Sequence, residues 1–365
     1  MYLALILFCI LFYLLCKNKA NKSTIKHYII TITVLLIAVS GLRHEAVGND
    51  TFSYIRLFDK ICIEEWGQIV DGFWEAYINP SSDAKDPGQF IIIKALSYIS
   101  SDSRMFLFIV AAILLIPLGI FVYRNSESLE TPCFFYVFYI TMFYPYLPNS
   151  AVRQSLALAM LIIGFLALQK RKVLSFLLVL FMATFVHKSV IIAALIIPFY
   201  YIKNTRLCYK LCLLLFVFML FYYQYVGVFL SMQSDIYEMY GTGEYYSYNH
   251  SVPYMVILMI LGLYFLGWTG INKDIAITNK RLVYGGAAMT LVWVVMVRLD
   301  PSVIRLTAYF GPWMGLMVPD SLKLISKRNF KVVFMILLLV FVVRACITPD
   351  NYHFLWQDME LHDRY

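Results

Sequence analysis

Charged residues are scarce in this sequence. They make up 14% of its 365 residues, whereas hydrophobic residues make up 61%; a soluble domain has about 25% charged residues. Apolar runs of membrane length recur along the chain, and the short alternating segments typical of a membrane β-barrel are absent. The composition excludes an ordinary soluble enzyme and predicts an all-α, polytopic integral membrane protein.

Several chemical signatures are also missing. The seven cysteines form no metal-ligand spacing with the six histidines, so we assign them to apolar packing and expect no metal site. Neither a P-loop nor a Gly-rich dinucleotide motif is present. The formal charge of +8 comes from short basic clusters between apolar runs, which indicates membrane topology and not a nucleic-acid partner. The sequence therefore predicts no cofactor.

The apolar runs predict about twelve spans. The Lys/Arg clusters after the first, fifth, seventh, ninth and eleventh spans fall on one side, which we interpret as cytoplasmic. We expect a single transmembrane domain, 1–365, with a large outer-face loop at 43–103 that contains an interfacial helix near 89–99, and a second outer-face loop at 230–251. The expected spans are 2–16, 28–42, 104–123, 132–147, 152–169, 173–186, 189–202, 207–229, 252–269, 282–298, 303–319 and 331–347.

Cations stand in the first turn of several spans that descend from the expected outer face. Arg153 and Arg305 each follow a serine by three positions, and we expect Ser150 and Ser302 to be helix N-caps. A cation in the first turn destabilises a helix by a few tenths to about 1 kcal/mol, because it faces the positive end of the helix dipole. An anion bound at the helix N-terminus turns this unfavourable interaction into a favourable one. Any single arginine can instead reach outer water or lipid phosphate. The residues expected to form a shared phosphate site are Arg43, Arg153, Lys188, Arg298 and Arg305.

Seven residues on the expected outer side are candidates for proton transfer, and two of them, His187 and Asp50, are preferred. The seven are His44, Asp50, Glu75, Asp86, His187, His250 and Asp300. His187 lies between two apolar runs beside Lys188, and a neighbouring cation favours the neutral imidazole that acts as a base. The alternative is a helix-ending histidine that bonds a backbone carbonyl. Asp50 is the second candidate for the base, or it orients an arginine or a sugar hydroxyl. Most tyrosines and phenylalanines near span ends fit an interfacial belt, although aromatic faces also hold sugars.

Short motifs occur at the expected outer ends of the spans, in order and across most of the chain. They are Gly41-Leu42-Arg43, Val47-Gly48-x-Asp50-Thr51 followed by Tyr54 and Phe58, Asp86-Pro87-Gly88-Gln89-Phe90, Arg153-Gln154-Ser155-Leu156-Ala157, Phe185-Val186-His187-Lys188-Ser189 and Arg305-x-x-x-Tyr309-Phe310.

Taken together, these motifs resemble the signature of the EpsG family of polysaccharide-biosynthesis membrane proteins. Gln89 is an added residue in the acid-Pro-Gly-aromatic motif. The resemblance implies a GT-C-like fold and grouping with Wzy-type O-antigen and capsule polymerases. The positions that match, and to which family roles are carried over, are 43, 48, 50, 153, 187, 188 and 305.

The resemblance implies that a growing glycan is transferred from undecaprenyl diphosphate to a lipid-linked repeat unit, on the outer side of the bacterial plasma membrane and without a metal. Implied partners are polyprenyl-diphosphate-linked oligosaccharides and membrane lipid, with a chain-length regulator and a flippase of the same pathway. The expected roles are catalysis by His187 and Asp50, diphosphate binding by Arg43, Arg153, Lys188, Arg298 and Arg305, and acceptor-sugar binding by Tyr54, Asp86 and Tyr309.

Other activities stay open from the sequence. A lipid-linked oligosaccharide flippase also needs arginines, but it needs access from both sides and typically shows internal repeats, whereas these charges stop at one face and no repeat is visible. A membrane acyltransferase that modifies surface sugars uses histidine and arginine, but it needs polar inner-face residues beyond the Lys/Arg clusters. A scaffold for other assembly proteins is the remaining alternative.

Overall fold

A computed structural model describes most of the chain. The described residues are 1–19, 21–79, 86–202, 204–231, 262, 278–298, 301–323, 326–348 and 351–357. Within these ranges the protein is helical and has no strand, and a single isolated bridge pairs Arg43 with Phe354. The fold is therefore all-α, as the composition predicts. The chain divides into two compact units, 1–191 with 337–365 and 192–336.

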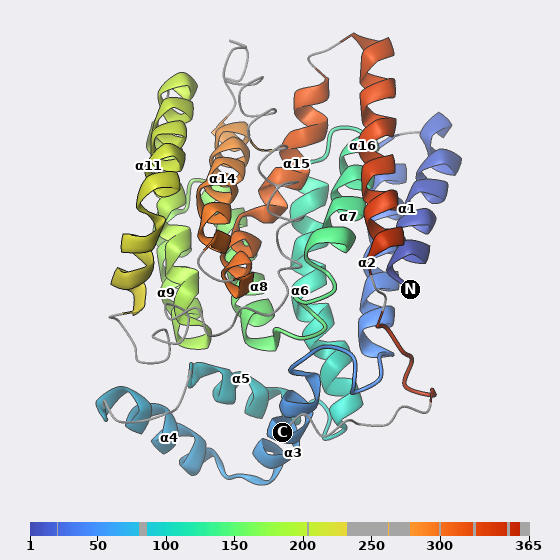
Figure 1. Ribbon diagram of the computed structural model, residues 1–365. Helices are drawn as coiled ribbons and strands as arrows, with labels where there is room; N and C mark the ends of the chain where they lie inside the picture. The colour runs from blue at the N-terminus through green and yellow to red at the C-terminus, as the bar shows by residue number, and fades with distance from the viewer. Residues whose placement is uncertain are drawn as a thin grey trace. The chain divides into compact units, whose positions relative to one another are not determined.

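The first unit contains a bundle of apolar helices that run side by side (Figure 1). In this bundle α2 packs on α6, α6 on α8, α8 on α9 and α1 on α7. The C-terminal part of α16 (Lys327–Ile347) also belongs to this unit, where Phe341 packs edge-on against Phe134 and Phe138. The bundle helices are α1 (Tyr2–Cys16), α2 (Lys22–Gly41), α6 (Ser103–Asn125), α7 (Glu130–Met142), α8 (Val152–Gln169) and α9 (Val173–Val186).

Four of the described helices are long and apolar enough to cross a membrane: α2, α6, α8 and α16. Six further apolar stretches are shorter, among them α1 and α9. The expected span at 252–269 lies outside the described residues except for residue 262, and so does most of the expected loop at 230–251. The protein is thus an integral membrane protein of apolar helices, and the structure does not confirm a count of twelve spans.

Three helices fill the segment 43–103 between α2 and α6. They are α3 (Thr51–Ile63), α4 (Trp66–Ile78) and α5 (Gly88–Ser97), and they lie across the end of the bundle where α6 begins (Figure 1). The apolar piece near 89–99 forms α5, which packs on α3, α4, α6 and α9. Lys94 of α5 is buried because its ammonium donates to the Ile61 and Cys62 carbonyls at the C-terminal end of α3. These contacts fix α5 against α3, while Gly88 at the start of α5 approaches Phe185 near the end of α9.

The C-terminal segment closes over the start of the same region. His44 N–H donates to the His353 carbonyl at 2.8 Å, and Leu355 N–H donates to the Leu42 carbonyl at 2.9 Å. The Tyr352 hydroxyl donates to the Val39 carbonyl at 2.6 Å. Residues 352–355 therefore cover the end of α2.

The second unit combines the 27-residue helix α11 (Thr205–Ser231) with shorter helices, several of them 3₁₀. Close packing in it relies on adjacent glycines of α14, because a Cβ on Gly285 or Gly286 would clash with the Phe199 or Trp313 side chain. The 3₁₀ helix η2 (Lys188–Ile196) leads into this unit. Its elements are α10 (Ile197–Tyr201), α11 (Thr205–Ser231), α14 (Thr278–Val294), η3 (Val295–Arg298), η4 (Pro301–Tyr309) and α15 (Gly311–Leu322).

Candidate functional site

The turn before α5 places a carboxylate at the end of α9. Asp86 has a positive φ of 51°, a conformation that aspartate tolerates better than most residues. Its side chain is buried, with 9% exposed. Two positions later, a Cβ on Gly88 would lie 2.6 Å from the Phe185 carbonyl oxygen. The acid-Pro-Gly sequence therefore lets the turn approach the α9 backbone closely enough to bring Asp86 to His187.

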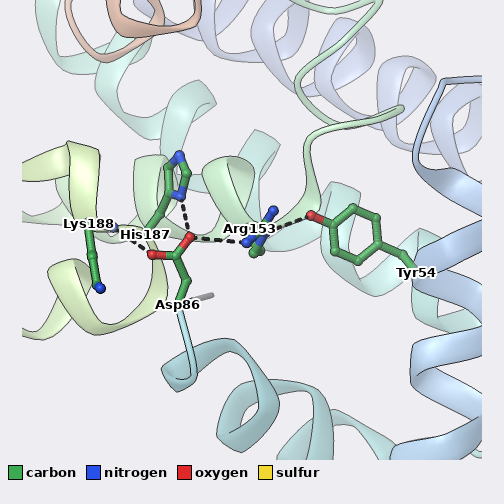
Figure 2. Close-up of polar contacts among 5 residues, drawn as sticks. All are labelled: Tyr54, Asp86, Arg153, His187 and Lys188. Atoms are coloured by element: carbon green, nitrogen blue, oxygen red, sulfur yellow. Dashed lines mark hydrogen bonds and ion pairs between the residues drawn. The ribbon is translucent and has the colours of Figure 1, made fainter. Parts of the chain in front are cut away.

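His187 ends α9 as its C-cap residue, and its N–H donates to the Ala183 carbonyl. The Nδ1 atom of its ring lies 2.8 Å from Oδ2 of Asp86, and Figure 2 shows the other ring nitrogen directed away from this carboxylate. A carboxylate only accepts hydrogen bonds, so Nδ1 carries the proton of this contact. In the neutral imidazole, Nε2 then keeps its lone pair, as a general base requires.

Lys188 contributes its backbone to the same carboxylate. Its N–H donates to Oδ1 of Asp86 at 3.0 Å. The Lys188 side chain is exposed and runs away from the carboxylate (Figure 2). The His-Lys pair of the motif thus contributes one ring nitrogen and one backbone donor to the network.

Arg153, in the first turn of α8, joins the network from the other side (Figure 2). Its Nη1 lies 3.2 Å from Oδ2 of Asp86, and its Nε donates to the Tyr54 hydroxyl of α3 at 3.1 Å. The guanidinium has five N–H donors in a rigid fork, and 28% of the side chain is exposed. Arg153 is therefore oriented by two partners and retains donors for an anionic ligand.

The charges of this network stabilise one another. Burial alone would raise the pKa of Asp86, but the hydrogen bond and charge of His187, the Lys188 N–H and the Arg153 charge outweigh it and lower that pKa. The guanidinium of Arg153 does not lose its proton in proteins, and its Nη1 contacts the Asp86 carboxylate. Asp86 and Arg153 are therefore ionised throughout the neutral range.

A second set of contacts fixes the turn that leads into α8. Gly48 has a φ of +88°, and a Cβ there would lie 2.0 Å from the Asn149 carbonyl oxygen. The Thr51 hydroxyl contacts this same oxygen at 2.5 Å. Asp50 N–H donates to the Ser150 hydroxyl at 3.3 Å. The Gly48-x-Asp50-Thr51 motif therefore holds the 149–150 turn that precedes α8, and Arg153 lies in the first turn of that helix.

Arg43 is almost fully buried, with 2% exposed. Its Nη1 donates to the carbonyl and hydroxyl oxygens of Ser40, and the Ser40 hydroxyl donates to the Asn149 side chain at 2.9 Å. Its Nε and Nη2 have no hydrogen-bond partner among the described residues. Burial lowers the pKa of Arg43 to about 10. Among the described contacts, none joins Arg43 directly to the Asp86 carboxylate.

The other expected site residues contribute differently or belong to the second unit. The Asp50 side chain is half-buried, makes no N-cap hydrogen bond at α3 and acts on Arg153 through its charge. Arg305, which is exposed, and Tyr309, which is buried, belong to the second unit. Arg298 ends η3, and its side chain lies outside the described part of the chain. The structure thus gathers Tyr54, Asp86, Arg153, His187 and Lys188 in one network.

Some structurally important residues were not singled out by the sequence. Asn149 was not identified, and Gly88 appeared only as part of a motif. Ser150 was expected to cap α8, but α8 begins at Val152 with Ala151 as its N-cap residue and no side-chain cap. Ser150 accepts from Asp50 N–H instead. Ser150 therefore lies one residue before the N-cap position and contacts the Gly48-x-Asp50-Thr51 segment.

The described ranges contain no group of three His, Cys, Asp or Glu residues that could hold a metal ion. The network combines the positively charged guanidinium of Arg153 with the imidazole of His187, which the Asp86 carboxylate orients. This combination can bind a phosphate group through Arg153 and remove a proton through His187.

Comparison with known proteins agrees with the motif pattern. The family model described as the EpsG family matches residues 26–349. Searches of curated proteins and of solved structures found no match. The matched region includes Arg43, Asp86, Arg153, His187 and Arg305, and thus every motif that carries the resemblance. The chain belongs to the EpsG family, the family of Wzy-type polysaccharide polymerases.

Proposed function

We propose that this protein joins lipid-linked oligosaccharides into a polysaccharide on the outer side of the bacterial plasma membrane. The donor is a growing glycan on undecaprenyl diphosphate, and the acceptor is a terminal sugar of another lipid-linked repeat unit. The acceptor hydroxyl oxygen forms the new bond to the anomeric carbon. The bond from that carbon to the diphosphate oxygen breaks, and the polyprenyl diphosphate leaves with the bonding electrons.

The single observation that carries this proposal is the network in which Oδ2 of Asp86 accepts from both His187 Nδ1 and Arg153 Nη1. In this network a base candidate and an arginine fork that can bind phosphate share one carboxylate, next to helices that are apolar enough to span a membrane. A glycosyl transfer from a lipid diphosphate needs both groups, because a hydroxyl must lose a proton while a diphosphate gains charge.

In this mechanism His187 Nε2 takes the proton from the attacking hydroxyl. Asp86 holds the imidazole in the tautomer that leaves Nε2 free, and it stabilises the imidazolium that forms. A base of this kind contributes about 10²- to 10⁴-fold to the rate. A single displacement inverts the anomeric carbon.

Arg153 stabilises the diphosphate as it leaves. A planar fork makes two parallel hydrogen bonds to phosphate oxygens, and Tyr54 fixes its orientation through Nε. Loss of such a donor costs about 2.7–4 kcal/mol in the transition state. Arg43 acts indirectly in this proposal, because it reaches the Asn149 turn through Ser40.

Except for that of Asp50, the remaining assignments rest on the sequence alone. Arg298 and Arg305 are proposed as further diphosphate ligands and Tyr309 as a sugar contact. Asp50 is proposed to support the Arg153 charge. A GT-C-like bundle of about twelve spans, with the Lys/Arg clusters facing the cytoplasm, would put the Asp86 network on the outer side.

The proposal is tested in cells that lack this gene, by gel analysis of the lipid-linked sugars. We expect single repeat units displayed outside the cell and no ladder of longer chains, restored by the wild-type gene. Units trapped inside would overturn the proposal in favour of a flippase. A normal ladder without acyl groups would overturn it in favour of an acyltransferase, and a normal ladder with all its groups would leave no enzymatic role in polymer assembly.

A further inference from the structure

A group of aromatic side chains lies beside the Asp86 network. Phe73 and Tyr77 of α4 pack against Phe185 of α9, with ring centroids 5.8 and 5.5 Å apart. Phe181, one turn earlier on α9, packs edge-on to Phe185 at 5.0 Å. We call these four residues, Phe73, Tyr77, Phe181 and Phe185, the α4–α9 aromatic cluster.

The cluster adjoins the turn that carries the carboxylate. Gly88 approaches the Phe185 backbone so closely that a Cβ would lie 2.6 Å from its carbonyl oxygen. Phe185 also precedes His187 by two positions. Burial raises the pKa of the Tyr77 hydroxyl, and the negative charge of Asp86 raises it further. Phe181 and Phe185 therefore share one short stretch of chain with the base candidate His187, and Tyr77 lies near the Asp86 charge.

The rings of the cluster remain partly open. Tyr77 is 41% exposed and Phe181 is 59% exposed, while Phe73 and Phe185 are half-buried. Tyr77 and Phe181 both pack edge-to-face with Phe185, and the exposed parts of their rings are accessible to a ligand. Because α4 is amphipathic and too short to cross a membrane, this side of the cluster belongs to the segment between spans.

We propose that the α4–α9 aromatic cluster is the acceptor subsite and holds a sugar ring of the incoming repeat unit by stacking on Tyr77 and Phe185. This inference rests on the proposed polymerase function and names the residues that hold its acceptor. The C–H groups of one sugar face are slightly positive and fit the negative face of an aromatic ring.

The neighbouring charges favour a sugar over the isoprenoid chain. An aliphatic chain against the Asp86, Arg153 and His187 groups would strip water from them without replacing its hydrogen bonds. A sugar brings hydroxyls that replace those bonds, and the Tyr77 hydroxyl adds a donor and acceptor of its own. Sites for small polar ligands commonly combine aromatic walls with a few convergent polar groups in this way.

The test uses purified full-length protein and single lipid-linked repeat units extracted from cells that lack the gene. The first variant is Tyr77→Phe, which keeps the aromatic ring and removes the hydroxyl. The other two, Tyr77→Leu and Phe185→Leu, keep an apolar side chain but remove the aromatic ring. Tyr98→Leu is the matched control, because Tyr98 is an exposed aromatic residue of the same segment that stacks on Trp66. The readouts are the KM for the repeat unit and competition by the delipidated oligosaccharide.

We expect the leucine variants to raise the KM roughly three- to tenfold and to weaken competition by the free oligosaccharide to the same extent. We expect Tyr77→Phe to lose less and Tyr98→Leu to match the wild type. A KM that is unchanged in both leucine variants would overturn the subsite and leave the polymerase intact. Weaker competition by undecaprenyl monophosphate, with oligosaccharide competition unchanged, would assign the cluster to the lipid chain instead. If neither the wild type nor any variant forms polymer, the proposed function itself is overturned.

Discussion

The carboxylate of Asp86 and the imidazole of His187 lie 2.8 Å apart although 101 positions separate them in the chain. The contact joins the turn before α5 to the end of α9. It is supported by the Lys188 N–H on the second carboxylate oxygen and by the close approach of Gly88 to Phe185. The orientation of the imidazole is therefore determined by a segment outside its own helix.

Asp86→Asn tests this relationship, because asparagine keeps the shape of the side chain and removes its charge. We expect polymer formation to fall by about 10²- to 10⁴-fold, as for loss of a general base, because an amide can present its N–H₂ group to Nδ1 and select the wrong tautomer. The measurement is the rate of chain growth in isolated membranes, normalised to protein amount. Asp71→Asn, at an exposed acid of α4, is the control and should leave the rate unchanged. A rate for Asp86→Asn within twofold of the wild type would contradict a catalytic role for the Asp86–His187 pair.

Arg153→Lys separates charge from geometry. Lysine retains the positive charge but loses both the planar fork and the Nε contact to Tyr54. We expect a loss of about 10²- to 10³-fold in kcat, equivalent to about 2.7–4 kcal/mol for one transition-state donor. Arg104→Lys, at an exposed arginine in the first turn of α6, should behave as the wild type. Equal activity of the two variants would show that Arg153 supplies only charge.

Gly48→Ala tests the turn that positions Arg153. The φ of +88° and the Asn149 carbonyl oxygen at 2.0 Å from the added Cβ leave no room for a side chain. We expect a destabilisation of at least about 1–3 kcal/mol, seen as a lower Tm of the detergent-purified protein. Gly72→Ala in α4, where nothing lies within 4 Å of the added Cβ, should leave Tm unchanged or raise it. Equal Tm values for the two variants would contradict a structural role of Gly48 in this turn.

The lowered pKa of Asp86 predicts a pH dependence of stability. A folded-state pKa below the unfolded-state value, about 3.9, means that the ionised form stabilises the folded protein. This contribution is present above the unfolded-state pKa and is lost as the pH falls through the folded-state pKa. We expect the Tm difference between wild type and Asp86→Asn to be constant from pH 7 to about 5 and to shrink below about pH 4. A Tm difference that grows as the pH falls would mean that the pKa of Asp86 is raised on folding, and would contradict the stabilising role of its ionised form.

Much of the architecture follows from the sequence, because apolar length and loop charge are local properties. The ranges predicted for α1, α8 and α9 agree with the structure, and the all-helical membrane class is confirmed. The 43–103 segment was harder to predict, since α3 and α4 are amphipathic and carry mixed polar residues that periodicity alone does not separate from a loop.

The site was predicted as a set of residues but not as an arrangement. Asp86 was expected to bind the acceptor sugar, yet its carboxylate contacts His187 and Arg153. Arg43 was expected to contact the diphosphate, yet it is buried under the C-terminal segment. Contacts across about a hundred positions depend on tertiary packing and are invisible to local pattern. The Pro-Gly pair after Asp86 was the available signal, because glycine marks a close backbone approach.

The reaction proposed for this protein is the formation of a glycosidic bond with release of a lipid diphosphate. The most direct measurement uses the purified protein in liposomes with single lipid-linked repeat units as the sole substrate. We predict a ladder of longer glycans and one polyprenyl diphosphate released for each bond formed, with both products lost together in Asp86→Asn and Arg153→Lys. Movement of repeat units across the bilayer without diphosphate release or chain growth would contradict it.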